Sequence, residues 1–428
     1  MNQNQKVFQL RGKIQHYAWG GNSYLPALLS KANPDGKPFA EYWLGAHENA
    51  PAEIVGVGNG DGHEGGHKAG VEVGHFVGNG IQLSKYIAEA PKERLGEYVN
   101  RQFGRLPYLL KILDVKDMLS IQVHPSKKNA ELEFAAENAR GKALTAPDRN
   151  YKDDNHKPEL MVALSEFWLL HGFKPEAELE AVLDSTAELS FLKPVFAAGG
   201  YAGLYKETME MPQEAVNKAL QPLLDRILPL YQDGSLTRGE EDFWAARAAN
   251  TYNEPGRIDR GIFSIYFFNL LNLHPGEAIF QDAGMPHAYL EGQNVEIMAN
   301  SDNVLRGGLT PKHVDVPELL KHVKFEATYA RIIGGKEAAG HISVFKTPAP
   351  DFELSRIDLL NQESVTIKAR SVEIFIVLSG RVDVGEKGTA SFARAKGESF
   401  IAFDGAEVVL AAPEDAIIYR AAVPQQGA

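Results

Sequence analysis

The chain has 428 residues, which is too long for one ordinary hydrophobic core, so about two or three domains are expected. Its composition, 44% hydrophobic and 23% charged, is typical of a soluble globular protein. The lack of cysteine excludes disulfide scaffolds, cysteine nucleophiles and thiolate metal sites, and the formal net charge of −12 argues against general nucleic-acid binding.

No apolar stretch approaches the roughly 20 residues that cross a bilayer. The first ten residues also lack the basic start and apolar core of a secretory signal. We therefore expect a cytoplasmic protein that binds neither membranes nor nucleic acid.

The N-terminal region begins with short β-like runs and turn signals and then becomes rich in glycine. The glycine-rich residues 56–80 contain His63, His67 and His75. An accessory metal site is one interpretation of these histidines. A surface loop is favoured, because so much glycine holds no fixed ligand geometry.

Helices are predicted in three places. Residues 81–102 favour a helical region in which Pro91 starts or kinks a helix. Ser126 is placed to cap a helix that ends near Gly141. From about 174 to 255, apolar residues recur at helical spacing with few strand candidates, which indicates an inserted helical domain.

β character returns from about residue 261, and one turn–strand–turn pattern occurs twice, in LHPGEAIFQDAGMPHAY and in ARAKGESFIAFDGAEV. This rhythm resembles that of jelly-roll (cupin-type) domains. The first copy ends in a histidine, His287, whereas the second ends in no ligand-type residue, so the first barrel is expected to carry the chemistry. We predict a mainly β fold with a catalytic jelly-roll barrel, a C-terminal jelly-roll barrel and an inserted all-α domain. The predicted boundaries are 1–173 and 259–325 for the catalytic barrel, 174–258 for the helical domain and 326–428 for the C-terminal barrel.

A strand with one polar face is predicted over residues 118–127, MLSIQVHPSK. Alternate side chains of a strand lie on opposite faces, so the apolar side chains within Leu119–Val123 share one face. Ser120, Gln122 and His124 share the other. Gln122 and His124 would lie about 7 Å apart along the strand, which suits either a shared ion or a hydrogen-bonded core cluster.

Four side chains are candidate metal ligands: Gln122, His124, Glu159 and His287. Oxygen and imidazole ligands without sulfur suit zinc, and also manganese, iron(II) or cobalt. Each residue alone has a structural alternative, such as a core histidine, a solvated glutamate or a glutamine bound to backbone. Sequence spacing supports only the pair Gln122 and His124, because the whole helical region separates Glu159 from His287.

A second polar cluster contains Glu296, Asp302, Arg306 and Lys312. Apolar residues that favour burial interrupt this cluster, and buried charges are costly unless they are paired or used. An internal salt-bridge network and a binding site are both consistent with this pattern.

Several blocks of the sequence resemble the type I phosphomannose isomerases. The longest are LPYLLKILDVKDMLSIQVHPSK, YKDDNHKPEL and HAYLEGQNVEIMANSDNVLRGGLTPK, and KIQHYAWGG and EYWLGAHENAP also match. The resemblance runs in blocks from about residue 10 to 325. Two departures are Gly307 after Arg306, where the family commonly has alanine, and Glu48 after His47, where proline is common.

This resemblance implies an aldose–ketose isomerase of carbohydrate metabolism that interconverts mannose 6-phosphate and fructose 6-phosphate through a cis-enediol. It implies one zinc ion per chain, with Gln122, His124, Glu159 and His287 as its ligands. The reaction needs a base that reaches both C1 and C2 and a group that stabilises the developing oxyanion.

The same resemblance suggests roles for further residues. Arg306 would hold the enediolate or the phosphate, Lys157 and Glu296 are alternative bases, and Asp302 would orient a cation. His156 would assist ring opening. The expected substrate contacts are Ser120, Lys111, Tyr289 and Lys312.

Two rival interpretations remain at the level of sequence. One is a cupin-type metalloenzyme of another class, such as an iron(II) oxygenase, whose usual ligands are two histidines and one carboxylate. The other is a non-catalytic protein that binds sugar phosphates. The preferred prediction is an enzyme that acts as a monomer on a phosphosugar. It leaves open whether the enzyme serves the glycolytic use of mannose or the supply of mannose 6-phosphate for nucleotide sugars such as GDP-mannose.

Overall fold

The computed structural model describes residues 5–55, 80–387 and 391–424, and these form mixed helices and antiparallel sheets. They divide into two compact units. Unit 1 comprises Met1–Tyr17, Asn22–Ile112 and Gly335–Ala428, and unit 2 comprises Ala18–Gly21 and Leu113–Gly334. The histidines of the glycine-rich stretch lie outside the described residues.

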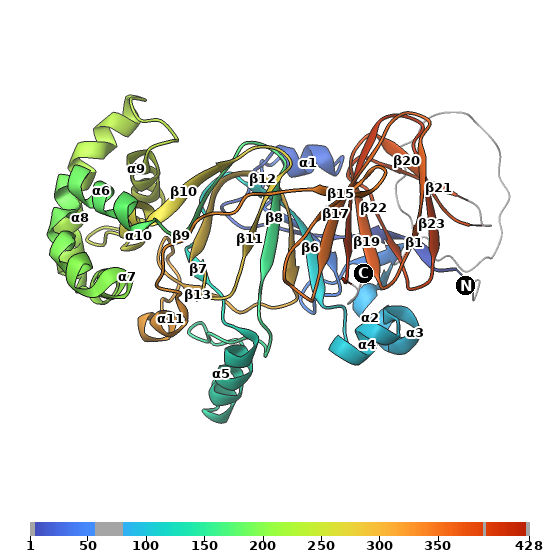
Figure 1. Cartoon of the computed structure of the whole chain (residues 1–428), viewed down its shortest axis with the longest axis horizontal. Helices are drawn as coiled ribbons and strands as arrows, with labels where there is room; N and C mark the ends of the chain where they lie inside the picture. Colours follow the sequence, from blue (N-terminus) through green and yellow to red (C-terminus); the bar gives the residue numbers. More distant parts are fainter. Residues whose placement is uncertain (1–4, 56–79, 388–390, 425–428) are drawn as a thin grey trace. The chain divides into compact units, whose positions relative to one another are not determined.

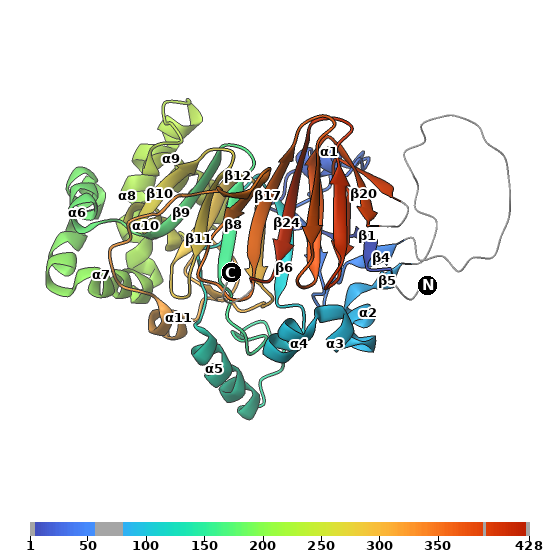
Figure 2. The same ribbon diagram turned by 45° about the vertical axis from the view of Figure 1, so that its right-hand side comes forward.

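Unit 1 is built mainly from two antiparallel sheets, whose strands run side by side in Figure 2. The nine-stranded sheet has the order β15 (Lys336–Ala339), β16 (Ile342–Phe345), β17 (Glu353–Leu359), β24 (Ala416–Ala422), β19 (Glu373–Ser379), β22 (Ser399–Ala402), β1 (Val7–Arg11), β4 (Glu53–Val55) and β5 (Ile81–Gln82). The four-stranded sheet has the order β18 (Ser364–Lys368), β23 (Glu407–Ala411), β20 (Arg381–Glu386) and β21 (Phe392–Ala395).

Alternation along these strands builds the core of unit 1. In β23, Val408 and Leu410 are buried whereas the residues between and beside them are half-buried, as expected for a strand with one core face. Apolar residues of both sheets form one buried cluster, in which the rings of Phe375 and Phe400 stack with centroids 4.5 Å apart. The remaining elements of unit 1 are β2 (Lys13–Gln15), β3 (Glu41–Gly45), α1 (Tyr24–Leu28), α2 (Leu83–Glu89), α3 (Pro91–Leu95) and α4 (Glu97–Phe103).

The helical prediction for residues 81–102 is confirmed from Leu83 onward, with breaks that its turn residues explain, whereas Ile81–Gln82 is strand β5. Pro91 begins α3, since proline lacks the backbone N–H that the first turn of a helix leaves unused. Gly96 has φ +83°, which separates α3 from α4 and which a residue with a side chain rarely adopts.

The chain passes into unit 2 within β6 (Tyr108–Val115). The strands β14 (Ile333–Gly334), β11 (Glu277–Gln281), β8 (Glu159–Ala163) and β12 (His287–Ala299) follow one another in the sheet. The first part of β12 also pairs with β9 (Phe167–Phe173) and β7 (Gln122–Val123), β9 pairs with β10 (Phe268–Leu273), and β7 pairs with β13 (Leu305–Arg306). The register shifts between Tyr289 and Glu291, so β12 serves two sets of partners.

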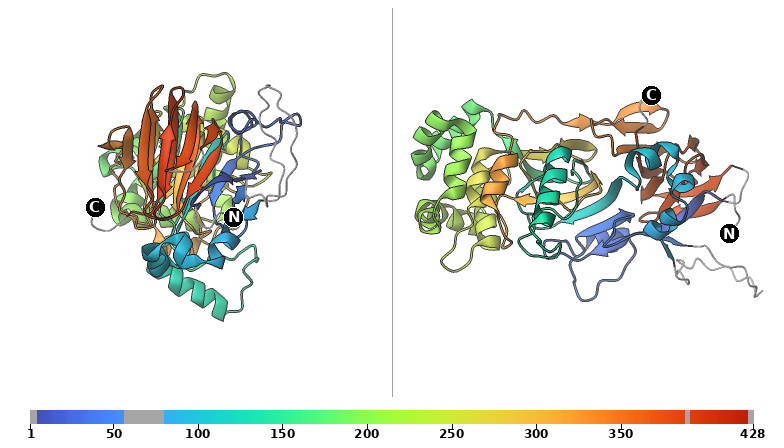
Figure 3. Two further views of the ribbon diagram at one scale, coloured as in Figure 1. Left: turned by 90° about the vertical axis from the view of Figure 1, so that its right-hand side faces the viewer. Right: turned by 90° about the horizontal axis from the view of Figure 1, so that it is seen from below.

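Helices gather beside β9 and β10 in unit 2 (Figures 1 and 3). They are α6 (Glu176–Ser185), the 3₁₀ helix Ala187–Leu192, α7 (Lys193–Glu210), α8 (Gln213–Gln232), α9 (Glu241–Tyr252) and α10 (Gly261–Phe267). Their buried residues share one cluster with Ile121, Val123 and Leu170 of the β region. This packing supports the strands that carry polar side chains.

Two local predictions need correction. Gly261–Phe267 was expected to be β but is α10, and all seven of its residues are buried, so its sequence has no amphipathic period that distinguishes helix from strand. The strand predicted over 118–127 is confined to Gln122–Val123. The backbone before Gln122 is not part of a strand and bonds to neighbouring segments, where Ile121 N donates to the Gly308 carbonyl.

The short strand also changes the predicted apolar face. Met118, rather than Leu119, packs in the same cluster as Ile121 and Val123, whereas Leu119 packs in a separate one.

The helix after this strand is confirmed as α5 (Lys127–Ala139). The Ser126 hydroxyl accepts from Asn129 N at 3.3 Å, and Gly141 lies just beyond the end with φ +71°. The last helix of unit 2 is α11 (Val316–His322).

Candidate metal centre

Strand register brings predicted site residues from distant parts of the chain into one row. His287 in β12 lies opposite Gln122 in β7, and Gln122 lies opposite Arg306 in β13. On the other side, His287 lies opposite His171 in β9. Directly opposed residues present their side chains on the same face of a sheet, so this row places a glutamine, two histidines and an arginine together.

Three of the four predicted ligands converge. His124, Glu159 and His287 are buried, and one ligand atom from each lies within 4.8 Å of the others. The Nε2 atoms of His124 and His287 each lie 3.3 Å from a different carboxylate oxygen of Glu159. Gln122 is half-buried and adjoins this group through its pairing with His287.

The outer nitrogen of each imidazole fixes its orientation. His124 Nδ1 lies 2.8 Å from the Asn303 carbonyl, and His287 Nδ1 lies 2.9 Å from the Met285 carbonyl. Each Nδ1 therefore donates a hydrogen bond, which leaves the Nε2 lone pair directed at Glu159. Two imidazole lone pairs facing a carboxylate repel one another unless a cation lies between them, so these residues fit a divalent metal ion.

The electrostatics of the group suit metal ligands. Burial lowers the pKa of His124 to about 4, so its imidazole is neutral at pH 7. Burial alone would raise the pKa of Glu159, but the neighbouring charge of Lys157 holds it well below its usual value. A neutral imidazole and an ionised carboxylate are the forms that bind metals.

Lys157 is buried beside the ligands, with Nζ 3.2 Å from a Glu159 oxygen. Glu296 is also buried, on the stretch of β12 that pairs with β8. His156 is half-buried next to Lys157. The structure therefore places both candidate bases in the same part of unit 2 as the ligand group.

Arg306 is half-buried, and it has no carboxylate partner among the described residues. Burial lowers the pKa of Arg306, and burial followed by the charge of Arg306 lowers the pKa of Lys312. The pKa of Lys152 is lowered mainly by burial and the charge of Arg149, with a smaller effect of Arg306. Lys152, which the sequence did not single out, thus joins a local group of cations. For Arg306, a salt-bridge network is not the explanation, and a site for an anion is favoured.

The remaining predicted residues have varied surroundings. Asp302 N donates to an Asp153 oxygen at 2.7 Å, and Ser120 is half-buried in the segment before β7. Tyr289 is buried, with its ring 5.3 Å from that of Phe167. Lys111 belongs to unit 1, where its Nζ lies 3.8 Å from Glu41 and faces the ring of Trp43.

Sequence reasoning missed Asn303, which contacts a candidate ligand. Its carbonyl orients His124, and its side-chain oxygen accepts from Lys152 N at 2.7 Å and from Asp153 N at 3.2 Å. Its amide nitrogen donates to the carbonyls of Asp153 and Asn155 at 2.8 and 2.9 Å. It thereby joins one ligand to the loop that leads to another. Its place in the distinctive block SDNVLRGGLTPK was the available signal.

Sequence reasoning also missed a hydrogen-bonded pair of side chains that lies beside the candidate ligands. His171 Nδ1 lies 2.7 Å from Gln281 Oε1, and both residues are buried. Burial lowers the pKa of His171 to about 4. Gln281 lies opposite Glu159 in the sheet, and His171 lies opposite His287. The pair therefore packs against the strands that carry two of the ligands.

Comparisons with known proteins agree with this geometry. Residues 7–176 match the family model described as phosphomannose isomerase type I, catalytic domain. The chain is 35% identical to mannose-6-phosphate isomerase of Escherichia coli K12 over 411 residues, covering 94% of this chain and 96% of that protein. It is 32% identical to the human mannose-6-phosphate isomerase over 455 residues, covering 97% and 98% of the two chains.

Comparison with solved structures also finds mannose 6-phosphate isomerases. The crystal structure of mannose 6-phosphate isomerase from Salmonella typhimurium, described as bound to its substrate and to zinc, matches with a TM-score of 0.84 and 32% identity. The match covers 98% of this chain and 100% of that one. A zinc-bound mannose 6-phosphate isomerase structure matches equally well, with a TM-score of 0.84. Within the described part of the chain, no helix is both long and apolar enough to cross a membrane.

Proposed function

We propose that this chain, which belongs to the type I phosphomannose isomerase family, interconverts D-mannose 6-phosphate and D-fructose 6-phosphate. The observation that carries the proposal is the buried group of His124, Glu159 and His287, whose facing lone pairs fit a divalent cation. Relatives named mannose-6-phosphate isomerase that span nearly the whole chain support the same reaction.

The metal in this proposal is one zinc ion per chain, held by His124, Glu159, His287 and the amide oxygen of Gln122. Nitrogen and oxygen ligands without sulfur suit zinc, and the related structures described with zinc support the choice. When bound, zinc supplies a Lewis acid that stabilises negative charge on substrate oxygens.

The chain's own residues would move the proton. After ring opening, assisted by His156, a base removes the proton from C2 of the aldose while O1 gains a proton, which gives the cis-enediol. The base then returns the proton to C1 while O2 loses its proton, which gives the ketose. Lys157 and Glu296 are the alternative bases, and both are buried near the ligands. Arg306 would stabilise the anionic enediolate or hold the phosphate, because its guanidinium has no carboxylate partner among the residues described.

The other predicted contacts complete the proposal. Asp302 would orient the cations, and Ser120, Lys111, Tyr289 and Lys312 would contact the phosphosugar. We also propose that the catalytic part is a cupin-type jelly roll formed by 1–173 and 259–325, that 174–258 is an inserted all-α domain, and that 326–428 is a second jelly roll. We expect a cytoplasmic protein that is a monomer. Light scattering of the purified protein would test the monomeric state.

One assay separates this function from its alternatives. Purified protein is incubated with mannose 6-phosphate, and fructose 6-phosphate is detected by a coupled enzyme, first as purified, then after chelation, then after zinc is restored. We expect turnover that chelation abolishes and zinc recovers. Absence of turnover in the zinc-restored protein would favour a non-catalytic binding protein, and turnover unaffected by complete metal removal would refute the metal assignment.

A further inference from the structure

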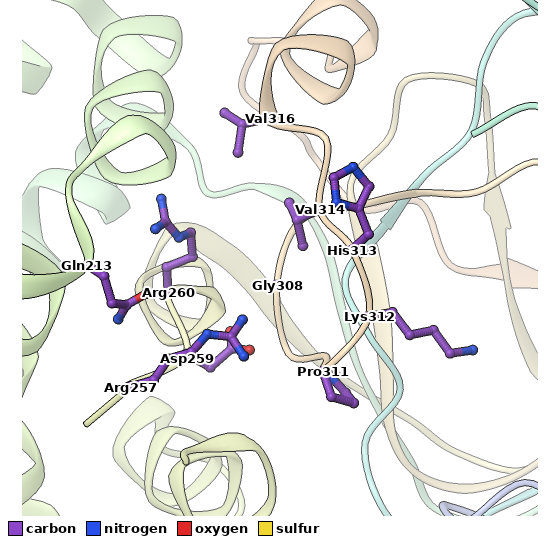
Figure 4. Close-up of a pocket in the computed structure, with 10 residues that line it drawn as sticks. All are labelled: Gln213, Arg257, Asp259, Arg260, Gly308, Pro311, Lys312, His313, Val314 and Val316. Atoms are coloured by element: carbon purple, nitrogen blue, oxygen red, sulfur yellow. The ribbon is translucent and has the colours of Figure 1, made fainter. Parts of the chain in front are cut away.

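A cavity lies in unit 2, and none of the proposed zinc ligands or candidate bases line it. It has a volume of about 410 Å³ and lies between the loop Gly308–Val316 and the segment Arg257–Arg260 (Figure 4). We call it the loop pocket. In Figure 4 the side chain of Lys312 points away from Arg257 and Arg260, on the other side of the loop.

The loop pocket is rich in positive charge, although the whole chain carries a net charge of −12. Arg257 and Arg260 supply this charge on one side of the pocket, and Lys312 lies on the other side of the loop. Arg260 has no ion pair among the described residues, and one of its N–H groups donates to the Met209 carbonyl. Arg257 has a loose ion pair with Glu254, at 3.5 Å.

The acidic residue of this pocket is already engaged. Asp259 is buried, and its carboxylate accepts from the backbone N–H groups of Gly261, Leu309 and Thr310 at 2.7, 2.8 and 3.1 Å. These bonds use its lone pairs on the backbone, so the two arginines keep N–H groups for a ligand. Within the described structure Asp259 forms no ion pair with either arginine, and its charge offsets only part of the effect of burial on the pKa of Arg260.

The same contacts join the loop pocket to Arg306. Leu309 and Thr310, which Asp259 holds, follow Arg306 in the chain by three and four residues. Ile121, directly before the ligand Gln122, exchanges backbone bonds with Gly307 and Gly308. A ligand that draws Arg257 or Arg260 toward itself would act on the segment that carries Arg306.

We propose that the loop pocket binds a small phosphorylated metabolite of the sugar-phosphate class, at a site separate from the metal centre. Arginine guanidinium groups match phosphate oxygens in geometry and charge, and Val314 and Val316 supply an apolar wall for the body of the ligand. The volume lies within the range of small-molecule sites, roughly 300–1,000 Å³. Burial lowers the pKa of Arg260, as expected for a guanidinium partly withdrawn from water.

Binding can be measured without turnover, so this test does not depend on the proposed isomerase activity. Zinc-loaded protein carrying Arg306→Ala is titrated with glucose 6-phosphate by calorimetry, so that Arg306 no longer holds phosphate. We expect about one binding event per chain, weakened at least tenfold by adding Arg257→Gln and Arg260→Gln. Val314→Phe, which fills the pocket and keeps its charges, should weaken binding similarly.

The control is Lys206→Gln with Lys218→Gln in the same background. It removes two exposed cations from α7 and α8, outside the pocket lining, and should leave the affinity unchanged. Circular dichroism would establish that each variant is folded. Loss of all binding with Arg306→Ala alone would show that the only phosphate site is the metal centre and would overturn the proposal. Equal affinity in the folded arginine variant and the control would overturn it as well.

Discussion

Arg306 and Asn303 are expected to serve the metal centre in different ways, although only two residues separate them. Arg306 presents a guanidinium without a carboxylate partner in the described structure, so it is available to an anion. Asn303 has its hydrogen-bonding groups directed at the protein, toward His124 and the loop of residues 152–155. The first is expected to contact substrate, and the second to position a ligand.

Arg306→Ala should keep its zinc and lose turnover by roughly 10²- to 10³-fold, the usual effect of removing one group that stabilises developing negative charge. Arg306→Lys should recover only part of the loss, because an ammonium cannot reproduce the planar fork of a guanidinium. Elemental analysis measures the zinc, and the coupled assay measures turnover. Normal turnover by a zinc-loaded Arg306→Ala variant would contradict the assigned role.

Asn303→Ala keeps the backbone carbonyl that accepts from His124 but removes the side-chain hydrogen bonds that hold this carbonyl in place. Zinc binding should therefore weaken by about 10-fold, the lower end of the effect of groups that orient metal ligands. Competition with a chromogenic chelator measures the affinity. Asn150→Ala is the matched control, because Asn150 lies in the same region but bonds to Asp315, which caps α11. If both variants bound zinc as tightly as the parent chain, Asn303 would have only a structural role.

At the scale of elements, α11 is held to the loop before the ligands by a buried carboxylate. Glu318 accepts from the Tyr151 hydroxyl at 2.6 Å and from Lys321 at 2.6 Å, and His322 Nε2 lies 3.2 Å away. The hydrogen bond to His322, followed by those to Lys321 and Tyr151, lowers the pKa of Glu318 to about 2, against the opposing effect of burial. The ionised carboxylate thus stabilises the folded state.

This pKa shift predicts a stability difference that depends on pH. The folded pKa of Glu318 lies below its ordinary value of 4.5, so its contribution is complete above pH 4.5 and is lost as the pH falls toward 2. Because solvent screens part of these interactions, the shift corresponds to a contribution of about 1–2 kcal/mol. Denaturant unfolding of the parent chain and of Glu318→Gln should show a gap in unfolding free energy that narrows over this range. If the difference in unfolding free energy between the two proteins stayed constant from pH 6 to pH 3, Glu318 would not have the lowered pKa.

Elements with a clear local signal were predictable from sequence, whereas others were not. Ser126, Pro91 and Gly141 mark helix ends by their own backbone chemistry, so the helices beside them were placed correctly. Gly261–Phe267 is buried on all sides, and periodicity cannot assign such a segment. β7 has only two residues because its neighbours bond to loops that local sequence does not reveal.

In the candidate site, too, some features had a local sequence signal and others did not. Alternation indicated that Gln122 and His124 belong together, but only the family resemblance joined them to Glu159 and His287. Cross-strand register accounts for their convergence, and register depends on pairings between residues more than 100 positions apart. Asn303 and Gln281 were missed because a residue that orients a neighbour through hydrogen bonds has no spacing pattern of its own.

At the scale of the whole molecule, the proposed zinc ligands all belong to unit 2. A bound metal stabilises the folded state by about 4 kcal/mol when its concentration is a thousand times its dissociation constant. Chains with more than one core commonly unfold in more than one transition. Metal removal should therefore act on the unfolding of unit 2.

Scanning calorimetry should show two transitions, of which chelation lowers the midpoint of one. Phe375→Ala is the matched perturbation in unit 1, where it removes a buried ring stacked on Phe400 and should cost about 3–5 kcal/mol. It should lower the midpoint of the other transition. If chelation and Phe375→Ala shifted a single common transition, the two units would unfold as one.

The central claim is that one zinc ion, held by the group around His124, Glu159 and His287, supports isomerisation. Its most direct test is a titration of the metal-free protein with zinc, in which mannose 6-phosphate turnover is recorded at each addition. We predict that turnover rises in proportion to zinc up to about one equivalent per chain, then stays constant, and that His287→Ala stays inactive at that ratio. Full turnover before any zinc is added, or none at one bound equivalent, would contradict the claim.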